Sequence, residues 1–321
     1  MNGRRAAEVA AGVLVLAFVA AYMREHWVEI RDYRWDPEPG LLATATLLAA
    51  AALILFGCVW TALLRALGEP LTITAGLRIW FVSNLARYVP GKVWQLSGTA
   101  YLARREGVDP VHAVWSSLLA QAIVLAVAVL LLLGALPATA ARVYGRGAQL
   151  ALALATAAMF ALYLSPLFDR AYARAATLLR GGSPPPALGL RNKLLLGAGT
   201  ALAWGVFATS FWVFLEAVTS ERLPPLAAAG IFVAGYLAGF LAFFTPGGLG
   251  VREGVYVVLL GPYLPTSVAL AAAILSRLWL TLVELVLASL SAVLPAGERR
   301  LRIPPASAGA PSQSSRAGLD A

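Results

Sequence analysis

The chain has 321 residues, of which 60% are hydrophobic and only 13% are charged. Soluble domains carry roughly 25% charged residues, so this composition excludes an ordinary soluble protein and indicates a multi-pass membrane protein. The formal net charge of +9 would suit a nucleic-acid-binding surface, but the basic residues lie in short segments between apolar runs, as membrane topology requires. We therefore expect an all-α integral membrane protein that does not bind nucleic acid.

Six apolar runs are long enough to cross the hydrocarbon core of a bilayer, which takes roughly 20 residues of helix. The predicted crossings lie at 6–23, 41–64, 112–134, 148–168, 194–215 and 267–294. The first run follows Arg4 and Arg5 and has the small residues Ala20 and Ala21 near its end, as a signal peptide has. The charged segment after Met23 instead favours an uncleaved first helix, so we keep this run as a crossing.

Two further hydrophobic stretches, at 77–104 and 227–262, each contain a proline-glycine pair. Setting Pro90 on Pro246 also aligns the glycine that follows and a leucine, an alanine and an aromatic residue that precede it. Proline removes a helical hydrogen-bond donor and glycine loosens the backbone, so both stretches should break. The predicted break residues are Pro90, Gly91, Pro246, Gly247 and Gly248. Each stretch thus predicts a re-entrant hairpin of two half-helices, which survives at membrane depth only when it is buried in protein or lines a cavity.

The basic residues predict the orientation of the chain. With the N-terminus in the cytoplasm, fifteen Lys and Arg residues fall on the cytoplasmic side, six fall outside and four are embedded in apolar stretches. This bias follows the positive-inside rule and predicts a protein of the cytoplasmic membrane with both termini in the cytoplasm. If the hairpins crossed as full spans, Arg142, Arg146 and the arginine-rich segment 170–193 would change sides, so the re-entrant arrangement fits better.

Four of the six crossings and the two hairpins form two halves of opposite orientation, an inverted-topology repeat. The predicted halves cover about 41–134 and 194–294, and a Gly-, Ser- and Pro-rich cytoplasmic segment at 180–186 lies between them. With the first crossing they make one membrane domain over residues 1–295. Residues 296–321 are rich in Pro, Ser, Gly and Ala and have no apolar run, so we expect a disordered cytoplasmic tail.

Three motifs carry a resemblance to a known family. They are NLARYVPGKVWQ at 84–95, YLARREG at 101–107 and PGGLGVREG at 246–254, followed by Arg277 in the last crossing. Over roughly residues 6–295, the chain resembles the transmembrane, flippase-like domain of the lysylphosphatidylglycerol synthases. We find no segment that resembles the soluble aminoacyl-transfer domain of full synthases, so we expect a stand-alone member. The resemblance implies lipid handling or translocation, and it does not imply lysyl transfer.

Two departures from the family pattern remove acidic groups from the first half. Many relatives have Gly-Glu where this chain has Trp94 and Gln95, and often Glu-Arg where it has Ala120 and Gln121. An ion-coupling role that the resemblance would assign to those carboxylates is therefore not supported in this chain.

Six ionisable residues lie inside the apolar stretches, where a charge costs at least about 2.5–3.5 kcal/mol and so needs a reason to be there. They are Arg87, Lys92, Arg252, Glu253, Arg277 and Glu284. The half-helices that follow the two breaks should aim their N-termini toward mid-membrane, where free N–H groups favour an anion. Because the cations outnumber the carboxylates, the predicted cavity is net cationic and suits an anionic lipid head group, above all a phosphate.

Structural roles for the same residues stay open. Arg252 could pair with its neighbour Glu253, and the two charges of the last crossing could pair along that helix. The two cations that flank the first break could extend to the cytoplasmic interface from a shallow hairpin.

Catalysis is not expected from the sequence. No P-loop, dinucleotide fingerprint, Gly-x-Ser-x-Gly elbow or His-Glu-x-x-His helix is present, and His26 and His112 are isolated. The single cysteine, Cys58, excludes an internal disulfide and a cysteine metal cluster. We therefore expect no cofactor and no metal.

Three functions remain open at this stage. The first is a lipid translocator that moves an anionic phospholipid or a polyprenyl-phosphate-linked lipid across the membrane as the two halves rock. The alternative is a non-transporting membrane enzyme or accessory subunit of glycolipid or cell-envelope synthesis, with a glycosyltransferase as its partner. The third is a membrane scaffold without a ligand, which predicts that alanine is tolerated at every embedded charge.

Overall fold

The computed structural model describes residues 24, 27–33, 35, 37–69, 71–88, 93–135, 147, 150–151, 154, 157–158, 160–180, 188–242 and 248–293. Within these residues the chain is all-helical, and its only extended pairing is one antiparallel bridge between Trp35 and Thr219. The predicted all-α class is confirmed for this part of the chain.

Among the described residues, four helices are long and apolar enough to cross a membrane. They are α3 (Pro39–Ala66), α6 (Pro110–Ala135), α9 (Leu190–Val218) and α12 (Thr266–Ala292). At a rise of about 1.5 Å per residue, each is longer than the ~30 Å hydrocarbon core. They confirm as helices four of the predicted crossings, those at 41–64, 112–134, 194–215 and 267–294. The run at 6–23 lies outside the described residues and 148–168 lies partly outside them, so both crossings stay predictions.

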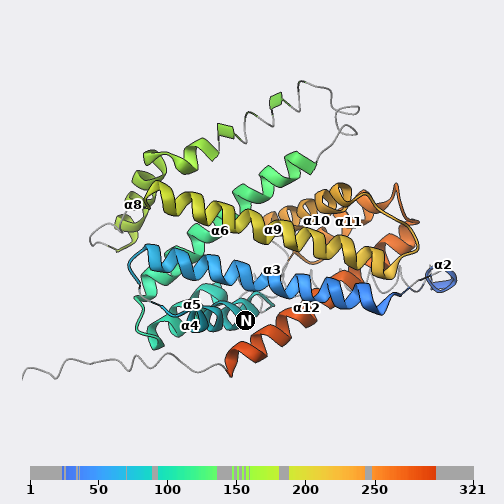
Figure 1. The fold of residues 1–321 in the computed structure, drawn as a ribbon, viewed down its shortest axis with the longest axis horizontal. Helices are drawn as coiled ribbons and strands as arrows, with labels where there is room; N and C mark the ends of the chain where they lie inside the picture. The colour runs from blue at the N-terminus through green and yellow to red at the C-terminus, as the bar shows by residue number, and fades with distance from the viewer. Residues whose placement is uncertain are drawn as a thin grey trace, which may run out of the picture.

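The centre of the molecule is an antiparallel pair of helices, α3 and α9, which lie side by side in Figure 1. Phe56 of α3 contacts Trp204 and Phe207 of α9, with ring centroids 5.8 and 6.2 Å apart. Glu38, which precedes α3, donates its backbone N–H to the carbonyl of Ala217 near the end of α9, at 2.9 Å. The start of α3 therefore lies beside the end of α9.

Small residues allow this pair to approach closely. α3 buries Ala45, Ala49 and Ala52 completely, and a Cβ on Gly199 of α9 would lie 3.0 Å from a methyl carbon of Val59. Between apolar helices in a membrane the hydrophobic effect gives little attraction, because lipid tails are equally apolar. Close packing of small residues therefore holds α3 against α9.

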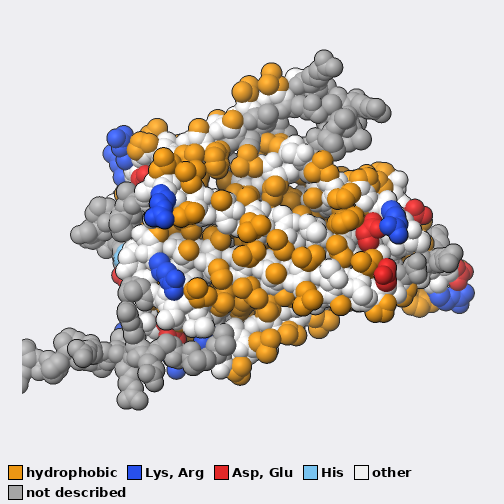
Figure 2. All heavy atoms as spheres, in the orientation of Figure 1, with side chains coloured by type: hydrophobic (Ala, Val, Ile, Leu, Met, Phe, Trp, Pro, Cys, Tyr) orange, Lys and Arg blue, Asp and Glu red, His pale blue; other side chains and the backbone are white. Residues whose placement is uncertain are grey.

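Charged side chains lie at the two ends of this pair, and Figure 2 shows hydrophobic side chains covering most of the visible face between them. We name the ends after two short helices, α8 (Pro166–Arg180) and α2 (Trp27–Asp32). The α8 end, where α3 stops and α9 starts, carries Arg65, Arg78, Arg104, Arg105, Arg170, Arg174, Arg191 and Lys193. The α2 end carries the acidic residues Asp32, Glu38, Glu216 and Glu221 beside Arg31 and Arg222. Basic charge is thus concentrated at the α8 end.

Both predicted breaks separate pairs of shorter helices. The first stretch forms α4 (Ile73–Asn84), the 3₁₀ turn η1 (Leu85–Tyr88) and α5 (Val93–Arg105). The second forms α10 (Pro225–Leu241) and α11 (Val251–Leu260). Of the predicted break residues, Gly248 is described and has a φ of +73°, whereas Pro90, Gly91, Pro246 and Gly247 lie outside the described residues.

The first broken stretch folds back on itself. Near the break, Asn84 of α4 accepts a hydrogen bond of 2.5 Å from Nε2 of Gln95 in α5. Farther from the break, Arg78 in the middle of α4 forms an ion pair of 3.6 Å with Glu106, which follows the end of α5. Because early residues of one helix contact late residues of the other, α4 and α5 form an antiparallel hairpin.

The second broken stretch folds back in the same way, with glycines where its two arms touch. A Cβ on Gly248 would lie 2.6 Å from the Cα of Gly239, so only glycine fits this crossing of backbones. One turn deeper in α10, Gly235 faces the ring of Tyr256 in α11. α10 and α11 therefore also form an antiparallel hairpin.

The two hairpins enter the bundle from opposite ends (Figure 1). α4 follows the end of α3 and α5 leads into α6, so the first hairpin opens at the α8 end. α10 follows the end of α9 and α11 leads into α12, so the second hairpin opens at the α2 end. Aligning Pro246 with Pro90 also aligns the first residue of α12, Thr266, with the first residue of α6, Pro110. The described helices thus form two halves of opposite orientation.

The helix α8 differs from the sequence prediction, which placed the end of a crossing and an arginine-rich loop over these residues. A proline at the start of a helix is preorganised for it, and the Ala, Arg and Leu residues that follow Pro166 favour helix. Lys193 holds this helix against α9, because its Nζ lies 2.9 Å from Oδ2 of Asp169 and donates to the carbonyl of Ser165 at 3.1 Å. The Lys193 side chain is only 2% exposed.

Replacing Lys193 by methionine should lower the stability of the protein by about 1–3 kcal/mol, because Asp169 loses its partner in a poorly hydrated position. Thermal unfolding in detergent measures this change. Arg191→Met, at an exposed position two residues earlier, is the matched control and should unfold like the wild type. Equal unfolding temperatures for the two variants would contradict a role of Lys193 in holding α8.

Candidate functional site

The predicted embedded charges of the second half meet between α11 and α12. Arg277 of α12 donates from Nη1 to Oε1 of Glu253 in the first turn of α11, at 2.8 Å. The other carboxylate oxygen of Glu253 accepts the backbone N–H of Gly250 at 2.7 Å. Glu253 is 6% exposed, and both of its oxygens are satisfied. A carboxylate at this position also stabilises the N-terminus of α11.

This pairing corrects one reading of the sequence, in which Arg252 pairs with its neighbour Glu253. The ion pair instead joins two helices, Glu253 with Arg277. Adjacent residues of a helix point in different directions, which separates Arg252 from its neighbour. Glu284, two turns after Arg277, is partly buried on α12.

Arg252 is held by aromatic rings. Its guanidinium carbon lies 5.4 Å from the ring centroid of Phe232 and 5.3 Å from that of Tyr256. Its Nε donates to the hydroxyl of Tyr256 at 2.9 Å. Glu253 and Glu284 both act on it electrostatically, without a hydrogen bond. Among the described residues, no group bonds to its two terminal nitrogens, so the part of the guanidinium that best recognises a phosphate is uncommitted.

The predicted site residues of the first hairpin are described only in part. The backbone of Arg87 lies in η1, which contacts α12, but its side chain is not described. Lys92 lies outside the described residues. The structure therefore brings together Arg252, Glu253 and Arg277, while a head-group role for any predicted site residue stays a prediction.

Two residues that the sequence analysis did not single out complete the arrangement. Tyr256 is 1% exposed and stands one turn after Arg252, a spacing that places both side chains on one face of α11. That spacing could have revealed it. Phe232 reaches Arg252 from α10, and no feature of the sequence indicates this contact.

The two halves differ at the position of Arg277. When the two halves are aligned, with Pro110 of α6 against Thr266 of α12, Arg277 is equivalent to Gln121 and Glu253 is equivalent to Ser97. Gln121 donates from Nε2 to the hydroxyl of Tyr236 in α10, at 3.3 Å. The first half thus has neutral polar groups where the second half has an ion pair.

Replacing Gly235 by alanine should disturb the support of Arg252. An added Cβ would lie 2.1 Å from Cε1 of Tyr256, so the ring and its hydroxyl must move away from the guanidinium. Overpacking of this kind costs about 1–3 kcal/mol, which thermal unfolding would detect. Gly254→Ala in α11 is the control, because a Cβ there meets nothing within 4 Å. A wild-type unfolding temperature for Gly235→Ala would contradict this packing.

These features define a helical multi-pass membrane protein with two oppositely oriented helical hairpins and an ion pair buried between α11 and α12. The family profile described as the lysylphosphatidylglycerol synthase TM region matches residues 7–288. The chain belongs to this family, as the motifs at both breaks predicted. A search of curated proteins finds no match.

Proposed function

We propose that this chain is a lipid translocator that binds an anionic head group at Arg252 and moves the lipid across the cytoplasmic membrane. The observation that supports it best is the guanidinium of Arg252, whose terminal nitrogens have no bonding partner among the described residues. A charge inside a membrane bundle is expensive unless it is paired. A phosphate ester supplies the missing partner, because it accepts two parallel hydrogen bonds from arginine.

Within the described part of the site, the neighbouring charges support one free cation, Arg252, rather than several. Arg277 is neutralised by Glu253 at 2.8 Å, and the carboxylate is further bound by Gly250. In the proposal this pair fixes α11 against α12, and Arg252 makes the contact with the lipid. Arg87 and Lys92 complete the head-group site from the first hairpin, and Glu284 balances part of its charge.

The proposed ligand is an anionic phospholipid or a polyprenyl-phosphate-linked lipid, since both carry a phosphate and a hydrocarbon chain. The membership of the lysylphosphatidylglycerol synthase TM region family supports a lipid-related function. Because the described part of the site has a stacked guanidinium and an ion pair but no activated nucleophile, we propose binding and movement of the lipid rather than catalysis.

The proposal includes the full predicted topology: six crossings, two re-entrant hairpins and both termini in the cytoplasm. The concentration of Arg and Lys at the α8 end supports a cytoplasmic location of that end. Because the hairpins open at opposite ends, rocking of one half against the other would expose the site to each leaflet in turn.

An accessory role for a glycosyltransferase partner is the rival proposal, because a phosphate held at Arg252 could also be presented to an enzyme. The two differ in what the purified chain does. A translocator exchanges lipid between leaflets alone, whereas an accessory subunit retains the lipid without exchange.

The test is leaflet exchange in vesicles that contain the full chain. Phosphatidylglycerol and phosphatidylcholine, each with a fluorophore on the acyl chain, are compared by quenching of the outer leaflet with dithionite. We expect faster exchange of phosphatidylglycerol than in protein-free vesicles, and little effect on phosphatidylcholine. Exchange no faster than in protein-free vesicles, for this lipid and for a labelled polyprenyl phosphate, would overturn the proposal.

A further inference from the structure

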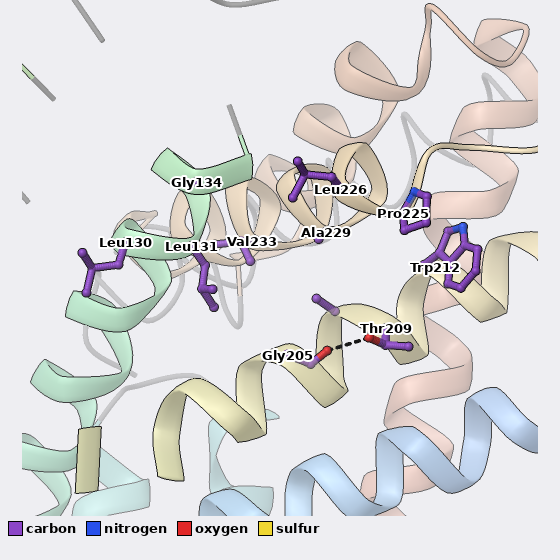
Figure 3. A pocket seen from close by; sticks show the side chains of 11 residues that line it. Leu130, Leu131, Gly134, Gly205, Thr209, Trp212, Pro225, Leu226, Ala229 and Val233 are labelled. Atoms are coloured by element: carbon purple, nitrogen blue, oxygen red, sulfur yellow. Dashed lines mark hydrogen bonds between the residues drawn. The ribbon is translucent and has the colours of Figure 1, made fainter. Parts of the chain in front are cut away.

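A groove lies between α6, α9 and α10, and none of the charged residues of the candidate site lines it (Figure 3). Its volume is about 320 Å³. Leu130, Leu131 and Gly134 line it from α6, and Gly205, Thr209 and Trp212 from α9. The first turns of α10 form its third wall, with Leu226 half-exposed at the rim and Val233 buried at the base.

The lining of the groove has no charge and no free hydrogen-bond donor to offer a ligand. Thr209 is bonded from Oγ1 to the carbonyl of Gly205 at 2.8 Å, as Figure 3 shows. Trp212 donates its Nε1–H to the carbonyl of Leu223 at 3.0 Å. None of the lining residues is charged. An occupant with a polar head would lose its hydration here and gain no hydrogen bond, so the lining selects an apolar group.

The size of the groove limits what it can hold. Its volume is at the low end of the about 300–1,000 Å³ that is typical of ligand pockets. A Cβ added at Gly134 or at Gly205 meets nothing within 4 Å, so both glycines face open space rather than a packed helix. The residue equivalent to Gly134 in the second half is Leu290 of α12, so the glycine that leaves this space is found in the first half alone.

The groove is also close to the proposed head-group site. Val233 forms its base, and the preceding residue, Phe232, carries the guanidinium of Arg252 on its ring. One helix, α10, thus separates an apolar groove from an uncommitted cation. The groove is suited to the hydrocarbon chain of a lipid, and the guanidinium of Arg252 is suited to an anionic head group.

We infer that this groove binds a single hydrocarbon chain of a membrane lipid. The binding depends on apolar contact and not on the head group, so it does not require the proposed translocation. Its failure and the failure of the proposed function can therefore be observed separately.

The test uses phosphatidylcholine with a photoactivatable diazirine in one acyl chain, incorporated with the full chain into nanodiscs. Irradiation and peptide mapping locate the adducts. We expect them to concentrate at the lining residues of α6, α9 and α10. Gly205→Leu fills the groove and should lower these adducts by about tenfold, a loss of about 1.4 kcal/mol in binding. Gly134→Leu fills it from the opposite wall and should act in the same way.

Two controls separate the groove from general lipid contact. Ala51→Leu adds the same bulk at an exposed position of α3, outside the groove, and should leave the adducts unchanged. Arg252→Gln should also leave them unchanged, even if it abolishes translocation. Adducts spread evenly over the lipid-facing helices, or unaffected by both glycine variants, would overturn the inference. So would a groove free of adducts.

Discussion

Replacing Arg252 by glutamine should slow the leaflet exchange of phosphatidylglycerol by at least about 100-fold, because two charge-assisted hydrogen bonds of about 1.5–3 kcal/mol each are lost. Glutamine keeps a donor near Tyr256 but has neither the charge nor the planar fork of arginine. The protein should still fold, since the ion pair between Glu253 and Arg277 does not involve this residue. The dithionite assay measures the rate, and thermal unfolding checks the fold.

Two further variants identify the cause of the loss. Arg252→Lys keeps the positive charge without the fork and should fall between wild type and Arg252→Gln. Arg222→Gln removes an arginine whose side chain is 92% exposed at the α2 end, and should exchange lipid like the wild type. Wild-type exchange by a folded Arg252→Gln variant would show that the head group binds elsewhere. An equal loss in Arg222→Gln would show that overall charge, not the site, sets the rate.

The positions of the helices follow from features that a single sequence displays. Apolar runs of sufficient length predicted α3, α6, α9 and α12, and the proline-glycine pairs predicted where the shorter helices stop. Both signals are local, since length and backbone chemistry do not depend on distant residues. The short amphipathic helix α8 was missed because its mixture of Arg, Ala and Leu also suits a basic loop.

The contacts of the site were harder to predict because they join residues that are distant in sequence. The sequence marked Arg252, Glu253 and Arg277 as expensive in a membrane, and the structure brings them together. It could not show that Arg277 pairs with Glu253, because that depends on how α11 packs against α12. The stacking of Phe232 on Arg252 depends likewise on the return of the chain through α10 and α11.

Removing the charge of Glu253 should destabilise the protein by about 3–5 kcal/mol, the usual cost of breaking a buried ion pair by removing one of its members. Glu253→Gln isolates the charge, because the amide oxygen can still accept the backbone N–H of Gly250. Arg277 would keep its full charge at 19% exposure without a carboxylate on α11. Unfolding of the purified protein by titration with a denaturing detergent measures the loss.

An ion pair with one exposed partner provides a matched control in the same chain. Glu216 lies 4.0 Å from Arg222, whose side chain is 92% exposed, and Glu216 also accepts a backbone N–H, that of Leu223, at 3.1 Å. Glu216→Gln therefore makes the same chemical change with the same backbone contact kept. It should cost no more than about 1 kcal/mol, because water already screens that pair.

The double variant Glu253→Gln with Arg277→Gln should recover most of the stability, since no unpaired charge remains between α11 and α12. The first half supports this expectation, because it holds Ser97 and Gln121 at the equivalent positions, without a charge. A double variant as unstable as the sum of the single changes would show that the two residues act independently. Arg277 would then be a second cation available to a head group, and the proposed site would contain two arginines instead of one.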